Sequence, residues 1–417
     1  MKAISFLGFN PSGYKETTYL NPLGSGGFKT TFIQEALVEF YKPKTLYILL
    51  TKTAETGIPK DASEPTWETL QKRLADKVDL QPIKNVPETH SIADIWRLFE
   101  QLTECLQEDN HVLFDITNGF RSLPVLALIA VSYLRVVRQV TIDGLIHGAF
   151  EAKNQDNETP IFDLLPIVSL LEWTTATDQF IKTGNGQALA SLLGNSDTAT
   201  HELAVSIDGI AQGLQLLRPM DVMREAAMLP DRIAAAAPSV SLSVPPFTAL
   251  LRRVEKDYGS FGLENPIDYK TRPQASLLRQ LKMVEWYAQK KQTVQALSLA
   301  REWLPSLLCY HFQVDPLNKA EREDMELLLN GGKLKDAQGN VIRESPRLAQ
   351  WPSGQKGKKL RTLWGGQLNL ANLRNDVLHA GFRKNPQSAE AIVQKTEKII
   401  DELKDIAEMW NLRDEAL

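Results

Sequence analysis

Three polar side chains near the C-terminal end of the sequence are of types that could act on a phosphate group. Arg374, Asn375 and His379 lie in the stretch LANLRNDVLHAGF, which spans residues 370–382. At about 100° per residue of helix, Asn375 and His379 share one face, and the long stem of Arg374 can bring its guanidinium over that face. A planar cation, an amide and an imidazole on one patch could hold a phosphate and transfer a proton.

The same stretch also has the features of an ordinary helix. Leu370, Leu373, Val377 and Leu378 recur at helical spacing and could bury an apolar stripe. An Arg-x4-His pair arises by chance in roughly a third of chains with this composition, and the adjacent Asn makes a chance match about twenty times rarer. The spacing alone is therefore weak evidence for a catalytic site.

The composition describes a large globular protein and gives no overall signature of nucleic-acid binding. The 417 residues suggest two or three domains, and 43% hydrophobic with 24% charged residues provide ample core. A net charge of −4 restricts any RNA contact to a local basic patch. The run KGKKLR offers one candidate patch for RNA phosphates, formed by Lys356, Lys358, Lys359 and Arg361.

The cysteines and the apolar runs indicate a cytoplasmic protein without a membrane segment. Cys105 and Cys309 lie far apart in apolar stretches, which fits reduced thiols and excludes a cysteine zinc site. No signal peptide is recognisable, and the longest apolar run, which begins at Leu123, is too short to cross a bilayer. No cluster of metal ligands is visible in the sequence.

The first half of the sequence alternates between strand and helix patterns. Strands are expected at residues 2–8, 45–50, 82–86, 111–117 and 139–150, and helices at residues 28–41, 67–78, 91–107 and 121–137. Ser91 is the expected N-cap of the third helix. This order predicts an α/β domain with a parallel sheet covered on both faces.

Two polar loops follow strands of this expected sheet, and ligands bind at the carboxyl ends of such strands. Glycines and helix N-termini suit a nucleotide-like ligand, and Tyr14 or Tyr19 could stack on a base, although strand-to-helix turns require similar residues in any case. GSGGFKTT lacks the glycine that a phosphate loop needs before Lys29, and no G-x-G-x-x-G is present. The candidate ligand-binding residues are Asn10, Ser12, Gly13, Tyr14 and Thr17 from the first loop, and Asp115, Thr117, Asn118, Gly119, Arg121 and Ser122 from the second.

The second half of the sequence is predicted to be helical. A break is expected at Gly184-Asn185-Gly186, and a Pro/Ser-rich break at residues 237–247. Helix-forming sequence continues from there, apart from an interruption at residues 336–357.

In combination, DITNG after a buried strand, HGAFEA from His147, and RNDVLH in a helical C-terminal half resemble the CRISPR-associated CARF–HEPN proteins of type III systems. The closest resemblance is to the group named for its Asp-x-Thr-His-Gly motif. It implies a Rossmann-like CARF domain at residues 1–172, a helical linker region at 173–270 and an all-α HEPN domain at 271–417. It further implies an endoribonuclease that cleaves single-stranded RNA without metal and is activated by cyclic oligoadenylate.

The resemblance also assigns roles to individual residues. Arg374, Asn375 and His379 match the catalytic motif of HEPN nucleases, and a homodimer would join two such motifs into one composite site. Cyclic tetra-adenylate is the expected activator, on family frequency alone. The motif histidine is replaced here by Asn118, which can form hydrogen bonds but does not titrate near neutral pH, so any ligand cleavage that needs an imidazole there is in doubt.

Two other functions are compatible with the sequence. The chain could be a CARF sensor whose helical half regulates transcription or recruits a partner, although no helix-turn-helix with a basic recognition helix is seen. It could also be a toxin-type HEPN nuclease that is not controlled by a cyclic nucleotide. A requirement for cyclic oligoadenylate in RNA cleavage would distinguish this last possibility from an activated ribonuclease.

Overall fold

The computed structural model describes residues 1–88, 91–108, 110–118, 123–194, 197–268 and 272–413. The chain forms two compact units, Met1–Glu172 and Trp173–Leu417. The residues expected to form a linker region and a HEPN domain fall together in the second unit.

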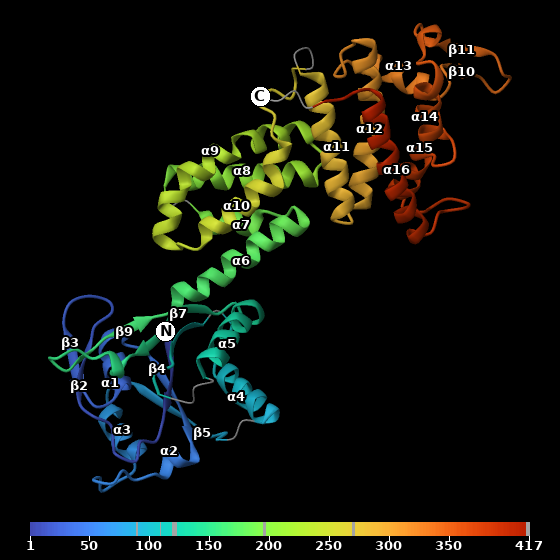
Figure 1. Ribbon diagram of the computed structural model, residues 1–417. Coiled ribbons are helices and arrows are strands. Elements are labelled where there is room, and N and C mark those ends of the chain that lie inside the picture. The colour runs from blue at the N-terminus through green and yellow to red at the C-terminus, as the bar shows by residue number, and fades with distance from the viewer. Residues whose placement is uncertain (89–90, 109, 119–122, 195–196, 269–271, 414–417) are drawn as a thin grey trace. The chain divides into compact units, whose positions relative to one another are not determined.

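A six-stranded sheet forms the centre of the N-terminal unit (Figure 1). All neighbouring strands are parallel except β9, which runs antiparallel to β7. Runs such as AISFL and LYILL are almost entirely apolar because both faces of these strands are covered. The sheet order is β5 (Asp79–Val86), β4 (Thr45–Thr51), β1 (Lys2–Leu7), β6 (His111–Asp115), β7 (Thr141–Gly148) and β9 (Ile161–Asp163).

Helices cover both faces of this sheet, which confirms the expected α/β architecture (Figure 1). On one face, α1 (Ile33–Tyr41) and α3 (Thr66–Leu74) bury apolar residues with β1 and β4. On the other face, α4 (Ile92–Glu104) and α5 (Leu123–Val137) pack against β6 and β7. Ser91 is the N-cap of α4 as predicted, because its side chain accepts a hydrogen bond from the backbone N–H of Asp94 at 3.1 Å.

A small second sheet was not predicted. It consists of β3 (Gly27–Thr30), β2 (Thr17–Leu20) and β8 (Glu158–Thr159), so part of the expected polar loop is a strand. The helix expected from residue 28 begins only at Ile33. Gly27 explains the difference, because a Cβ there would lie 2.7 Å from Thr18 Cγ2 on the paired strand. The unit also contains α2 (Lys52–Thr56) and the short η1 (Phe150–Ala152).

The C-terminal unit is almost entirely helical, as predicted (Figure 1). The expected break at residues 184–186 is confirmed, with Gly184 at a φ of +79° between α6 and α7. The helices are α6 (Leu165–Thr183, which begins in the N-terminal unit), α7 (Gln187–Leu193), α8 (Thr198–Gln215), α9 (Pro219–Ser243), α10 (Phe247–Tyr258), α11 (Pro273–Gln289), α12 (Thr293–Phe312), α13 (Lys319–Leu329), α14 (Gly354–Gly365), α15 (Leu370–Leu378) and α16 (Ala389–Met409).

Two interruptions of the helical half differ from their expected bounds. The break expected from residue 237 begins later, because α9 continues through Pro238 to Ser243. Ala236 and Val240 on either side of that proline are buried, so packing outweighs the lost backbone hydrogen bond. The interruption at 336–357 contains part of a hairpin formed by β10 (Lys333–Lys335) and β11 (Val341–Glu344), and then the start of α14.

Within the described part of the chain, no helix combines the length and the apolar character that crossing a membrane requires.

Candidate functional site

The helix α15 carries the Arg-Asn-x3-His motif and is held in place by its apolar face. Asn369 caps its N-terminus by accepting a hydrogen bond from the backbone N–H of Asn372. Leu370 and Leu373 are buried, and α15 packs against α12. This packing fixes the direction in which the polar side chains of α15 leave the helix.

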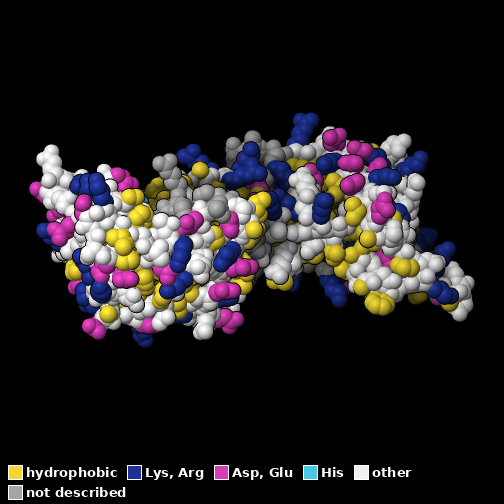
Figure 2. Space-filling model, turned by 90° about the horizontal axis from the view of Figure 1, so that it is seen from below, with side chains coloured by type: hydrophobic (Ala, Val, Ile, Leu, Met, Phe, Trp, Pro, Cys, Tyr) yellow, Lys and Arg dark blue, Asp and Glu magenta, His cyan; other side chains and the backbone are white. Residues whose placement is uncertain are grey.

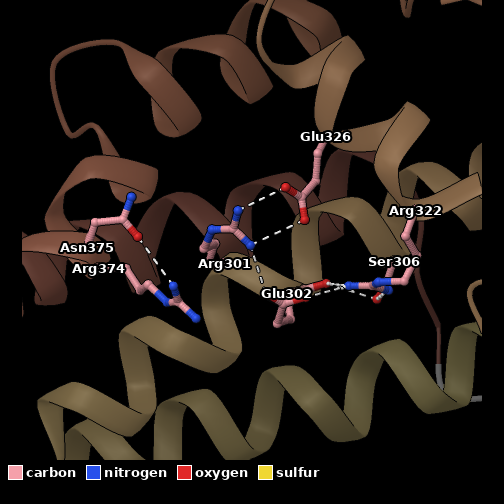
Figure 3. A network of polar contacts seen from close by, with 7 residues as sticks. All are labelled: Arg301, Glu302, Ser306, Arg322, Glu326, Arg374 and Asn375. Carbon is pink, nitrogen blue, oxygen red and sulfur yellow. Dashed lines mark hydrogen bonds and ion pairs between the residues drawn. The ribbon is translucent and has the colours of Figure 1, made fainter. Parts of the chain in front are cut away.

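Arg374 is half-buried and points toward α12 and α13 (Figure 3). Its only side-chain hydrogen bond among the described residues runs from Nη1 to Asn375 Oδ1, at 3.3 Å. Its Nε is buried and has no partner there. The side chain lines a pocket of about 490 Å³ together with Glu302, Ser306 and Arg322.

The carboxylates around this pocket are already paired with other arginines (Figure 3). Arg301 donates to Glu326 at 2.9 and 3.3 Å and to Glu302 at 2.8 Å. Arg322 donates to Glu302 at 2.7 Å and to Ser306 at 2.9 Å. The two carboxylates, Glu302 and Glu326, are therefore engaged by the two guanidinium groups of Arg301 and Arg322. The positive charge of Arg374 is left without a carboxylate partner in the described structure, which favours binding of an anion.

His379 lies at the opposite end of the motif. Its backbone N–H donates to the carbonyl of Asn375 at 3.0 Å, which places it at the C-cap of α15. Its side chain is exposed and makes no hydrogen bond to the described residues, so its ring nitrogens are available for proton transfer.

The expected convergence of Arg374 and His379 on one patch is not found within the single chain. The two residues are five positions apart, which is about 140° around a helix. The pocket of Arg374 does not include His379 in its lining. Asn375 contacts the guanidinium of Arg374, so in the single chain it orients Arg374.

The basic run belongs to α14 and is partly neutralised. Lys359 forms salt bridges with Asp405 at 2.6 Å and Glu402 at 3.1 Å, and these carboxylates raise its pKa. Lys356 lies over the ring of Trp410, and Arg361 lies over that of Trp351. Lys358 and Arg361 are exposed. These two have the most surface available for RNA, and the proposed phosphate contacts of the run stay a prediction.

The two candidate ligand loops of the N-terminal unit do lie at one edge of the sheet. They follow β1 and β6, which are parallel neighbours, and β7 ends beside them at Gly148. In the first loop, Asn10 and Ser12 are exposed, and a φ of +73° at Gly13 permits its tight turn. In the second loop, Asn118 is half-buried. Gly119, Arg121 and Ser122 lie outside the described residues.

Other predicted ligand residues are buried and position these loops. Asp115 is 1% exposed, and it accepts hydrogen bonds from Ser5 at 2.5 Å and from the hydroxyl and backbone N–H of Thr117. Burial raises the pKa of Asp115, and these hydrogen bonds oppose the rise. The Thr117 hydroxyl in turn accepts from the backbone N–H of Gly148 at 2.8 Å. Asp115 thus ties together the ends of β1, β6 and β7.

Thr17 and Tyr14 have a similar supporting place in the first loop. Thr17 is fully buried and hydrogen-bonds to Thr159 and to the carbonyl of Asn157. The Tyr14 hydroxyl donates to the carbonyl of Gly8 at 2.7 Å, and burial raises its pKa. The polar groups of Thr17 and Asp115 are thus engaged within the protein, and their contact with a ligand stays a prediction.

The helices α4 and α5 carry an exposed apolar face that was not predicted from the sequence. Its members are large apolar side chains that are at least 43% exposed: Ile92, Ile95, Trp96, Val125, Ile129, Tyr133, Val136 and Val137. Those on α5 recur every three or four residues, which was the available signal, but apolar residues on the other sides of the same helix obscure it. A contiguous apolar surface such as this face of α4 and α5 is typical of a protein–protein interface.

The charged side chains of the N-terminal unit show no such clustering. Figure 2 shows that basic and acidic side chains are intermixed on one face of this unit.

Among the described residues, no group of three or more His, Cys, Asp or Glu side chains could hold a metal ion.

Comparisons with known proteins match both units. Residues 2–150 match the model of the CARF domain of the CRISPR system endoribonuclease Csx1, and residues 169–264 match the model of the second domain of CRISPR-associated protein MJ1674. The MJ1674 protein of Methanocaldococcus jannaschii is 28% identical over 107 residues, which cover 25% of this chain and 17% of that relative. The chain thus matches only a small part of that protein.

A solved structure shows the same fold over almost the whole length. It is Csm6 of Enterococcus italicus bound to cyclic hexa-2′-fluoro-hexa-dAMP, with a TM-score of 0.51 and 10% sequence identity. The match covers 99% of this chain and 95% of that one. At this identity the likeness concerns the fold alone. Together with the two domain models, it makes the chain similar to CRISPR-associated proteins that carry a CARF domain.

Proposed function

We propose that the chain is an endoribonuclease that cleaves single-stranded RNA without a metal ion and is activated by a cyclic oligoadenylate, in type III CRISPR antiviral defence. The observation that carries this proposal is the state of the motif on α15. Arg374 has a guanidinium without a carboxylate partner among the described residues, and His379 has an exposed imidazole without a hydrogen bond to them. An arginine that serves only stability would be paired, as Arg301 and Arg322 are.

These groups suit an attack by the RNA's own 2′-hydroxyl. The 2′-oxygen loses its proton to a base and bonds to the adjacent phosphorus, and the bond to the 5′-oxygen breaks as that oxygen takes up a proton. The products are a 2′,3′-cyclic phosphate and a 5′-hydroxyl. His379 would transfer the proton, and Arg374 would hold the non-bridging oxygens, whose charge grows in the transition state.

A homodimer would supply what one chain lacks. One chain has a single motif histidine, and its Arg374 and His379 do not line the same pocket. Two chains around a two-fold axis could bring both copies of Arg374 and both copies of His379 to one shared site. The exposed apolar face on α4 and α5 supports dimer formation through the N-terminal unit.

The proposed activator site is the sheet edge where the loops after β1 and β6 meet. The Csm6 structure with a cyclic hexanucleotide analogue supports a cyclic ligand in this fold. Asn118 and the exposed loop residues Asn10 and Ser12 would bind it directly, whereas Asp115 and Thr117 would hold the loops in place. Cyclic tetra-adenylate remains the expected ring size.

The decisive experiment is an RNA-cleavage assay with a panel of cyclic oligoadenylates of different ring sizes. We expect the purified chain to cut single-stranded RNA only when one ring size is present, and to remain fully active in excess EDTA. Cleavage without any activator would instead indicate a toxin-type nuclease. Activator binding without cleavage would indicate a sensor, and loss of cleavage in EDTA would contradict the metal-independent mechanism.

Substitutions in the activator site should change the activator concentration that cleavage requires, and should leave the maximal cleavage rate nearly unchanged. Thr117→Ala removes the hydroxyl that links Asp115 to Gly148. Asn118→Ala removes a side-chain amide from the sheet edge where the activator is proposed to bind. The loss of about 1.4 kcal/mol of binding free energy would raise the activator concentration for half-maximal cleavage about tenfold. Thr248→Ala in α10 removes a hydroxyl with only a local hydrogen bond and is the matched control. If both loop variants respond like the parent protein, the activator binds elsewhere.

A further inference from the structure

The segment that follows α15 presents an aromatic ring to solvent directly after the motif. Phe382 is 92% exposed, more than any other large apolar residue in the described structure. It is also the only exposed Phe, Tyr or Trp among the described residues of the C-terminal unit. Leaving a phenyl ring in water is unfavourable, and a single exposed apolar residue can be incidental. Its surroundings therefore decide whether it has a use.

The backbone holds Phe382 in place. The end of α15 is closed by hydrogen bonds from Ala380 N–H to Val377 O at 3.0 Å, and from Gly381 N–H to Asp376 O at 3.1 Å. Phe382 N–H then donates to His379 O at 3.0 Å. Ala380 and Gly381 both have positive φ, at +52° and +73°. Such a conformation is unfavourable for alanine and persists where the surrounding structure enforces it. The backbone on which Phe382 is exposed is therefore a defined turn.

The next residues line a pocket of cationic and amide groups. This pocket has a volume of about 410 Å³, and its polar lining includes Asn369, Asn372, Asn385, Arg383, Lys384 and Lys395. Its one acidic lining residue, Asp376, is buried, lies 3.7 Å from the Arg383 guanidinium and accepts from the backbone N–H of Gln387. In a chain with a net charge of −4, this is a local concentration of positive charge. A protein partner that covered Phe382 would favour apolar neighbours, whereas cations and amides around an aromatic ring suit a single-stranded nucleic acid.

We propose that Phe382 stacks on a base of the bound RNA, and that the pocket lined by Arg383, Lys384 and Lys395 holds the phosphate beside that nucleotide. The inference rests on the proposed ribonuclease function and adds a substrate-positioning site to it. Phe382 is three residues from His379, so a stacked base would fix the strand close to the group that transfers the proton. Stacking tolerates every base, and the site would therefore hold the strand without strict sequence preference.

The test measures RNA binding without turnover. The full-length chain with His379→Ala, saturated with activator, is titrated with a labelled 12-nucleotide RNA and with a strand of equal charge that lacks bases. Phe382→Ala should weaken binding of the RNA about five- to hundredfold and leave the baseless strand unaffected. Phe382→Trp should restore binding of the RNA, and Phe382→Leu should not. Phe162→Ala, which removes an exposed phenyl ring from β9, is the matched control.

Lys384 tests the phosphate part of the site. It makes no hydrogen bond or ion pair to the described residues, so its loss should not disturb the fold. Lys384→Ala should weaken binding of the RNA and of the baseless strand equally. It should also reduce the salt dependence of binding by about one ion.

The alternative outcomes are distinct. If Phe382→Leu binds RNA normally and Phe382→Ala lowers the molar mass in solution, the ring packs against a second copy of the chain and the inference is wrong. If the RNA is bound and cut, and no Phe382 variant differs from the parent, the inference alone fails. A chain that neither binds nor cuts RNA overturns the proposed function and this site with it.

Discussion

Replacing His379 with Ala is expected to slow RNA cleavage by a factor of about 10²–10⁴, because positioned proton transfer contributes that much to a rate. The exposed ring makes no hydrogen bond to the described residues, so its removal should leave the stability of the fold unchanged. The measurement is a single-turnover cleavage rate at saturating activator, with thermal unfolding as the check on folding. His201→Ala, at an exposed histidine on α8, is the matched control. An active His379→Ala protein would exclude His379 as the proton-transfer group.

Substitutions of Arg374 test the same site through its positive charge and its planar shape. Arg374→Ala should slow cleavage by about 10²–10³, since it removes charge stabilisation of the transition state. Arg374→Lys should restore little, because lysine cannot reproduce a planar two-point contact with phosphate oxygens. Activator affinity should be unchanged in both variants, and Arg253→Ala on α10 serves as the control at an exposed arginine.

The parts of the fold that depend on local sequence were predictable. Unbroken apolar runs identified β1, β4 and β6, and the Ser91 cap identified the start of α4. The errors fall where distant contacts decide the outcome. The residues before α1 form β3 because Gly27 permits close pairing with β2, and α9 passes through Pro238 because its neighbours are buried.

In the candidate site, too, local sequence was predictable and the effects of distant contacts were not. The types and spacing of Arg374, Asn375 and His379 are visible in the sequence. The direction of Arg374 is not, because it depends on α12 and α13 and on carboxylates that Arg301 and Arg322 occupy. Likewise, Asp115 looks like a ligand-binding residue in the sequence. Its burial becomes evident only through Ser5, which precedes it by 110 residues.

The division of Arg374 and His379 between different sides of α15 leads to the prediction for mixed dimers. If one chain cannot bring its own guanidinium and imidazole together, each reaction needs groups from both chains. A dimer of one wild-type chain and one His379→Ala chain lacks one of the two histidines at the shared site. We expect it to retain less than about a tenth of the wild-type rate, because loss of either the acid or the base removes most of the catalysis.

This experiment requires two affinity tags and co-expression of the two chains. The mixed dimer is isolated by sequential purification on both tags, and its cleavage rate at saturating activator is compared with that of a doubly tagged wild-type dimer. Both should bind the activator equally, since His379 lies in the other unit from the ligand loops. A mixed dimer that keeps half of the wild-type rate would show that each His379 works alone. The composite-site mechanism, in which both histidines serve one reaction, would then be wrong.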